Sequence, residues 1–191
     1  MTDTPMNPMN QAMNPKEPLK PNTNGMLRLF VYGTLKRGFW NHDHFCRGVL
    51  TVEDAVVCGR LFETSSGIPV LQVPDEGILA VGTTNPLADV ATQAHVAARM
   101  SNPEQTPDRH QENDTGAPWG PVYGELLTFN DPVIRLPAIA RLEGFHPGGP
   151  CLYRRVLIPV RANGTMLPAW LYVVGDRWTG SFKELSGGIW R

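Results

Sequence analysis

The sequence lacks a strong charge of either sign. Its 17 Lys and Arg residues nearly balance its 18 Asp and Glu residues, which gives a formal net charge of −1 at pH 7. Nucleic acids and acidic membrane surfaces are normally bound through a basic protein surface. The composition therefore gives no electrostatic support for a nucleic acid or membrane partner, and we expect a small-molecule ligand.

The sequence is also poor in cysteine and in long apolar runs. Cys46, Cys58 and Cys151 are odd in number, lie far apart and form no C-x-x-C pair, so they indicate neither a disulfide framework nor a zinc site. The N-terminal segment has no apolar stretch long enough for a signal peptide or a membrane span. We therefore expect a protein of the reducing cytoplasm.

The length and composition favour one domain. A chain of 191 residues with 41% hydrophobic residues can bury a sizeable core but is short for two domains. Residues 1–25 contain five prolines, no aromatic residue and no apolar periodicity, so we expect them to be a disordered tail. The folded domain is predicted to span residues 26–191.

Most of this domain reads as β-structure. Bulky β-forming residues at 27–32 run directly into a glycine, which predicts a first strand followed by a loop. Similar segments, rich in β-branched or aromatic residues and bounded by Gly, Pro, Asn or Asp, lie at 55–62, 68–73, 122–129, 153–160 and 170–174. The sequence therefore predicts a mainly β domain with few helices.

Two helices are indicated by local signals. Residues 131–144 carry a capping candidate in Asp131, a first-turn proline in Pro132 and a terminating glycine in Gly144. Pro137 opposes this assignment, because an interior proline removes a hydrogen bond and can kink or split a helix. A shorter helix is expected at 42–47.

Residues 83–118 read as a polar insertion. Their second half, 102–114, shows no core pattern, and a surface excursion is the expectation for such a long polar segment. Their first half offers an alternative, because Asn85 and Pro86 form a plausible helix start and small apolar residues follow at helical spacing.

The first candidate site is the loop Tyr32-Gly33-Thr34-Leu35, which directly follows the first predicted strand. A glycine in such a loop lets the backbone approach a ligand closely. Consecutive N–H groups can then point at a carboxylate or a developing oxyanion. Taken alone, the same residues also suit an ordinary strand-to-loop turn.

The second candidate is Glu143, at the end of the helix predicted over 131–144. A carboxylate is disfavoured at a helix C-terminus by the helix dipole, so a functional reason for its position is worth testing. Partial burial would raise its pKa toward the range where it can take and return a proton. The alternative is an ordinary surface glutamate.

Together these segments resemble the gamma-glutamylcyclotransferase family. The resemblance rests on five segments in the same order, over residues 27–175 apart from the insertion: Y-G-T-L-K-R-G at 32–38 with Asn41-His42, V-Y-G-E-L at 122–126, L-E-G-F at 142–145, Y-R-R with Ile158 and Val160 from 153, and A-W-L-Y-V at 169–173. The family commonly has L-D-x-x-E-G at the helix end, whereas this chain has Ile139 and Ala140 at the first two positions.

The resemblance implies an α+β fold, a small, mainly antiparallel β-barrel-like domain with flanking helices. It also implies an enzyme that releases 5-oxoproline when the α-amine of a gamma-glutamyl group attacks its own γ-carbonyl. This is an amide-cleaving, cyclising acyl transfer or lyase reaction that uses no metal or organic cofactor. Glu143 would be general base and then general acid, and the loop Tyr32 to Leu35, with Gly33 and Thr34, would bind the glutamyl part.

Other interpretations remain open from the sequence. Tyr123, Tyr153 and Tyr172 are possible polar groups of a pocket, although packed core tyrosines are commoner in strands. Cys46 with His42 four residues earlier could form a nucleophile and base. The segment 41–44, with two histidines and one aspartate, gives an incomplete metal-ligand set.

The sequence also leaves open whether the protein is a catalyst and which substrate it would use. A non-catalytic module that binds a small metabolite could use the same fold. Gamma-glutamyl amino acids, gamma-glutamylamines and gamma-glutamyl-protected intermediates share the glutamyl half, so the leaving group cannot be read from these residues. The form Y-G-T-L-K-R-G with Asn41-His42 looks most similar to the gamma-glutamylamine cyclotransferase branch. No feature of the sequence indicates the oligomeric state.

Overall fold

A computed structural model describes residues 25–101 and 119–191. Its strands are β1 (Leu27–Val31), β2 (Thr51–Thr64), β3 (Pro69–Gln72), β4 (Ala80–Val81), β5 (Gly120–Phe129), β6 (Tyr153–Ala162), β7 (Thr165–Val174) and β8 (Phe182–Glu184). Its α-helices are α1 (Trp40–Phe45), α2 (Pro86–Met100) and α3 (Pro132–Leu142), and a short 3-10 turn covers Asp75–Gly77. Of the predicted disordered tail, residues 1–24 lie outside the described residues.

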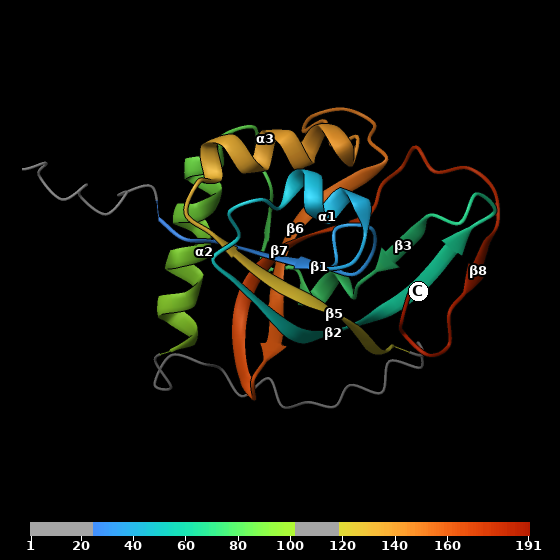
Figure 1. Ribbon diagram of the computed structural model, residues 1–191, viewed down its shortest axis with the longest axis horizontal. Helices are drawn as coiled ribbons and strands as arrows, with labels where there is room; N and C mark the ends of the chain where they lie inside the picture. Colours follow the sequence, from blue (N-terminus) through green and yellow to red (C-terminus); the bar gives the residue numbers. More distant parts are fainter. Residues whose placement is uncertain (1–24, 102–118) are drawn as a thin grey trace, which may run out of the picture.

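The strands β2, β5, β1, β7 and β6 form a closed barrel (Figure 1). All neighbours are antiparallel except β1 and β7, which are parallel, and the barrel closes where Ala55 and Val56 of β2 pair with Ala162 and Arg161 of β6. The long strand β2 continues beyond the barrel and pairs there with β3 and β8. The expected α+β, mainly antiparallel barrel with flanking helices is therefore confirmed.

Strands β1 and β7 of the barrel are buried on both faces. Along β1, Leu29 and Val31 belong to a cluster that also holds residues of α2 and α3, whereas Phe30 packs with inward residues of β5, β6 and β7. Strand β7 alternates in the same way, with Trp170 under the helices and Leu171 inside the barrel. Burial on both faces explains why these strands read as nearly continuous apolar runs.

The strand predictions are confirmed in position, and most of the strands are longer than predicted. The shorter helix begins at Trp40 rather than at His42, and ends at Phe45. Helix α3 runs unbroken through Pro137, so this proline does not split the helix. Asp131 occupies the N-cap position, but its carboxylate pairs with Arg135 instead of capping the backbone.

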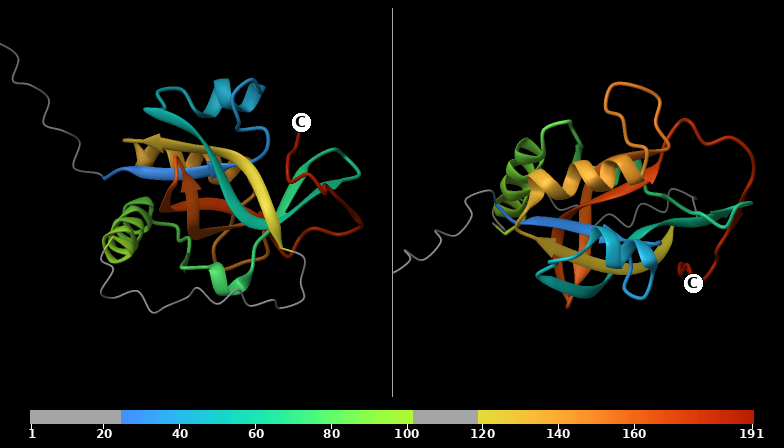
Figure 2. Two further views of the ribbon diagram at one scale, coloured as in Figure 1. Left: turned by 90° about the horizontal axis from the view of Figure 1, so that it is seen from below. Right: turned by 45° about the horizontal axis from the view of Figure 1, so that its top comes forward.

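In the first half of the insertion the expected surface excursion is wrong, and the helix offered as the alternative is confirmed. Residues 86–100 form α2 rather than a surface excursion, and the side chain of Asn85 accepts hydrogen bonds from the N–H groups of Leu87 and Ala88. Helix α2 packs against β7 and α3 and lies beside the start of β1 (Figure 2), where Gln93 bonds the backbone of Met26 and Arg28. Residues 102–118 lie outside the described residues.

Within residues 25–101 and 119–191, no helix is both long enough and apolar enough to cross a bilayer.

Candidate active site

The barrel topology brings several chain segments to one of its ends. Strands β1 and β7 are parallel, so the loop after β1 and the end of β7 meet there, together with the start of the antiparallel strand β6. A cavity of about 260 Å³ opens at this end. It is lined by Phe30, Val31, Tyr32, Gly33, Thr34, Leu35, Asn41, Ile68, Pro69, Leu142, Glu143, Leu152, Tyr153, Tyr172 and Trp178.

Both predicted site segments line this one cavity, although about a hundred residues separate them. The loop Tyr32 to Leu35 forms one part of the wall, and Glu143 forms another. The loop approaches the β3 segment so closely that a Cβ on Gly33 would lie 2.6 Å from Cγ of Pro69. Glycine is required at this position by close packing rather than by a positive φ angle.

The loop is held by its carbonyl groups and side chains. The carbonyl of Gly33 accepts from the N–H of Lys36 at 3.0 Å, and the carbonyl of Leu35 accepts from Nδ1 of His42 at 2.8 Å. Nδ2 of Asn41 donates to Oγ1 of Thr34 at 2.8 Å. The N–H groups of Gly33, Thr34 and Leu35 donate to no other described residue, so these donors remain free to bind a ligand.

The exit of the loop is fixed by Glu125 of the V-Y-G-E-L segment. Its carboxylate accepts from the backbone N–H of Arg37 at 2.9 Å and from Nε of Arg37 at 2.8 Å. Glu125 is nearly fully buried, and charge-assisted hydrogen bonds of this kind are stronger than neutral ones. The motif residue Glu125 therefore positions the loop and does not line the cavity.

Glu143 is the C-cap residue of α3, and Gly144 follows it with a φ of 60°. Its carboxylate makes no hydrogen bond or ion pair with any residue in the described part of the chain. Burial without a compensating partner raises the pKa of Glu143 from 4.5 to about 7, because the charged form is poorly solvated. Such a carboxyl group can accept and donate a proton near neutral pH.

Three tyrosines have different roles at the cavity. Tyr32 donates its hydroxyl proton to the carbonyl of Tyr172 at 2.8 Å, and Tyr153 donates to the carbonyl of Pro69 at 2.7 Å. Burial raises the pKa of both phenols. Tyr172 instead accepts a hydrogen bond from Nη1 of Arg155 at 3.1 Å. Tyr123, the third tyrosine considered from the sequence, is 47% exposed and does not line the cavity.

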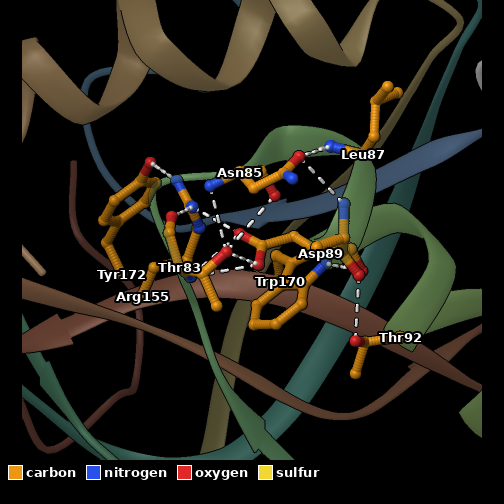
Figure 3. Close-up of polar contacts among 9 residues, drawn as sticks. Thr83, Asn85, Leu87, Asp89, Thr92, Arg155, Trp170 and Tyr172 are labelled. Carbon is orange, nitrogen blue, oxygen red and sulfur yellow. Dashed lines mark hydrogen bonds and ion pairs between the residues drawn. The ribbon is translucent and has the colours of Figure 1, made fainter.

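Sequence reasoning missed Asp89, Arg155 and Trp178. Asp89 and Arg155 form a buried ion pair at 2.5 Å next to the cavity (Figure 3). The only sequence signal for Arg155 was its place in the Y-R-R segment, and Asp89 lies in the segment read as an insertion. Trp178 follows the last barrel strand and lines the cavity, where its ring meets that of Tyr153 edge to face.

The structure argues against the thiol alternative. Cys46 is buried in a hydrophobic cluster and does not line the cavity. Burial raises the pKa of its thiol to about 12, which leaves almost no thiolate at neutral pH. Sγ of Cys46 lies 3.9 Å from the carbonyl of Leu35 and is not bonded to His42, whose Nδ1 donates to the same carbonyl.

Comparison with solved structures finds proteins of low sequence identity. YkqA from Bacillus subtilis is 20% identical with a TM-score of 0.45, and the match covers 86% of this chain but only 39% of YkqA. An AIG2-like protein from Mus musculus is 17% identical with a TM-score of 0.47, over 81% of this chain and 80% of that one. The uncharacterized protein PH0828 from Pyrococcus horikoshii is 16% identical with a TM-score of 0.43, over 86% and 89%.

No curated protein matches the chain. The family described as gamma-glutamyl cyclotransferase, AIG2-like, matches residues 29–110 and 111–191. These ranges contain the loop at Tyr32 to Leu35, the helix end at Glu143 and all the barrel strands except the first two residues of β1. The chain therefore belongs to the gamma-glutamyl cyclotransferase, AIG2-like family.

Proposed function

We propose that this protein releases 5-oxoproline from a gamma-glutamyl amine or a gamma-glutamyl amino acid. The observation that carries the proposal is the pairing of two features in one cavity. Glu143 presents an unpartnered carboxyl group whose pKa is raised to about 7, and the loop at Gly33 to Leu35 presents backbone donors with no partner among the described residues. An amide-cleaving cyclisation needs both a proton carrier and donors for negatively charged oxygen.

The proposed reaction begins with the substrate α-ammonium group giving a proton to the carboxylate of Glu143. The freed amine attacks the γ-carbonyl carbon of the same glutamyl group, and negative charge develops on the carbonyl oxygen. Glu143 returns this proton to the leaving amine as the bond to that amine breaks. The carboxylate then takes the second proton from the attacking nitrogen, which becomes the amide N–H of 5-oxoproline, and passes it to the released amine, which leaves as an ammonium ion. Atoms and charges balance without an oxidant, a reductant or a cofactor, and such acid–base catalysis typically contributes about 10² to 10⁴ in rate.

The loop Tyr32 to Leu35 is proposed to bind the glutamyl half of the substrate. Its donors suit either the α-carboxylate or the developing oxyanion. Holding the glutamyl group in a compact conformation also lowers the entropic barrier to ring closure. The small cavity volume of about 260 Å³ supports a substrate part of this size.

A gamma-glutamylamine is the proposed substrate within this class. The form Y-G-T-L-K-R-G with Asn41 and His42 supports this choice, and both of these residues bond the loop. The apolar lining from Ile68, Tyr153 and Trp178 is compatible with the methylene groups of an amine leaving group. We further propose that the protein acts in the cytoplasm, since its three cysteines are free.

The test uses wild-type protein and its Glu143→Gln variant with a panel of gamma-glutamyl amines and gamma-glutamyl amino acids. Release of 5-oxoproline is followed by mass spectrometry. We expect the wild type to turn over at least one gamma-glutamyl amine and Glu143→Gln to lose at least about 10²-fold in rate. Glu76→Gln, which changes an exposed carboxylate outside the cavity, is the matched control and should retain the rate.

Two results would count against the proposal. If Glu143→Gln kept the wild-type rate, Glu143 would not be the proton carrier. If the wild type bound 5-oxoproline or gamma-glutamyl ligands but released no product from any of them, the chain would be a non-catalytic binding module on the same fold.

A further inference from the structure

A buried polar cluster connects helix α2 to the cavity. Asp89 of α2 accepts hydrogen bonds from the backbone N–H and the hydroxyl of Thr83 and from Nη2 of Arg155. The backbone carbonyl of Asp89 accepts from Nε1 of Trp170 at 3.3 Å. The side chains of Asp89 and Arg155 are only 1% and 2% exposed, so this cluster is shielded from water.

Arg155 is held in a single orientation by its surroundings. Nη2 donates to Oδ2 of Asp89 at 2.5 Å and to the carbonyl of Thr83 at 2.7 Å, and the guanidinium carbon lies 4.6 Å from the ring centroid of Phe145. A Cβ on Gly82 would lie 2.7 Å from Nε of Arg155, so glycine at this position makes room for the guanidinium. Its remaining terminal nitrogen, Nη1, donates to the hydroxyl of Tyr172 at 3.1 Å.

This contact determines what the hydroxyl of Tyr172 can do. A guanidinium group only donates hydrogen bonds, so Arg155 occupies an acceptor position of the phenolic oxygen and leaves its proton to point elsewhere. The proton of Tyr172 has no acceptor among residues 25–101 and 119–191, and Tyr172 lines the cavity that contains Glu143. Figure 3 shows this sequence of contacts from Asp89 through Arg155 to Tyr172.

We infer that Asp89 and Arg155 are positioning residues that orient the hydroxyl of Tyr172 as a hydrogen-bond donor to a negatively charged oxygen of the glutamyl substrate. The inference rests on the proposed function for the identity of that substrate. The inference gives α2 a role in the active site, because Asp89 of this helix fixes the side chain of Arg155 and balances its charge. A buried charged pair is not needed for stability alone, because well-packed apolar residues often replace such pairs without loss.

The activity test is a cycle of folded variants. Tyr172→Phe removes the hydroxyl, and the double variant Asp89→Leu with Arg155→Met replaces the ion pair by apolar residues that avoid an unpaired buried charge. Each change should lower kcat/KM for 5-oxoproline release by about 10- to 100-fold, as expected for one hydrogen bond to a charged acceptor. In the Tyr172→Phe background, replacing the pair should cause little further loss.

The matched control replaces Arg60 and Glu184 by Met and Leu. This ion pair is also close, at 2.6 Å, but it lies on the surface and outside the cavity, so kcat/KM should not change. The split between kinetic constants locates the acceptor: a higher KM indicates the α-carboxylate, and a lower kcat indicates the developing oxyanion. Equal losses from the Asp89 and Arg155 replacement with and without the Tyr172 hydroxyl would overturn the inference.

A second readout does not depend on turnover. In protein labelled with ¹³C at Cζ of tyrosine, the Tyr172 signal is assigned by its absence in Tyr172→Phe. Replacing Asp89 and Arg155 should shift this signal, and 5-oxoproline should shift it in the wild type but much less in the double variant. If the wild type releases no product yet shows these shifts, the proposed function fails and the positioning role stands. If 5-oxoproline leaves the signal unmoved in an active wild type, the positioning role fails alone.

Discussion

Two carboxylates of this protein, the buried Asp89 and the partly buried Glu143 of the cavity wall, lie in opposite surroundings. Asp89 accepts three kinds of hydrogen bond, from a backbone N–H, a hydroxyl and the guanidinium of Arg155. Glu143 has no partner within the described residues, and burial raises its pKa to about 7. The comparison teaches that a satisfied buried carboxylate holds structure in place, whereas an unsatisfied one costs stability and remains available for proton transfer.

The largest expected effect is the loss of stability when Asp89, the hydrogen-bonded carboxylate of this comparison, is replaced. Asp89→Asn keeps the shape of the side chain but leaves Arg155 as an uncompensated buried charge. We expect the free energy of unfolding to fall by about 3–5 kcal/mol, measured by urea denaturation at pH 7. The exposed-pair variant Glu184→Gln should lose at most about 1 kcal/mol. A similar small loss of stability for both variants would show that Asp89 does not stabilise the fold by compensating the charge of Arg155.

The next effect is the pH dependence of stability that Glu143, the carboxylate without a partner among the described residues, should cause. Because folding raises the pKa of Glu143 from 4.5 to about 7, the folded state holds its proton when the unfolded state has lost it. The contribution of protonated Glu143 to the free energy of unfolding is therefore complete below pH 4.5. It is lost as the pH rises to about 7, and the loss is at most about 3 kcal/mol. Urea denaturation at pH 5 and pH 8 should show this decrease in the wild type, relative to Glu143→Gln, which has no carboxyl group to ionise at this position. Parallel pH dependences for the two proteins would contradict the shifted pKa.

A smaller effect concerns the loop that faces Glu143. In Gly33→Ala the added methyl group would meet Pro69 at 2.6 Å, and relieving such overpacking typically costs about 1–3 kcal/mol. We expect the loop donors to move and 5-oxoproline release to fall, measured as kcat/KM beside a thermal unfolding curve. Gly149→Ala is the control, since a Cβ there meets nothing within 4 Å. Unchanged kcat/KM in Gly33→Ala would remove the loop from substrate binding.

The smallest effect on the reaction is expected at Cys46. This thiol lies in a hydrophobic cluster away from the cavity, and its raised pKa makes it a poor nucleophile. Cys46→Ala should retain the wild-type rate of product release while losing some stability by core truncation. Loss of turnover in a folded Cys46→Ala protein would restore the thiol mechanism.

The local patterns of the sequence were sufficient for much of the fold. Strands β1, β2, β3, β5, β6 and β7 and helix α3 lie where alternating or apolar segments and their Gly and Pro boundaries indicated. The short strands β4 and β8 were not predicted, because two or three residues carry no periodicity of their own. Helix α2 was underestimated because its apolar residues are mostly small, so its buried Asp89 and Gln93 looked like part of a polar loop.

The sequence by itself identified the residues that we propose for the chemistry: a glycine loop after β1 and a glutamate at the end of α3. Only the tertiary structure decided that these residues share one cavity, that Glu143 lacks a partner and that Asp89 meets Arg155 across 66 positions of the chain. The reason is that strand propensity and capping act between near neighbours. Burial, and with it the pKa of a carboxyl group, depends on strands and helices that only barrel closure brings together.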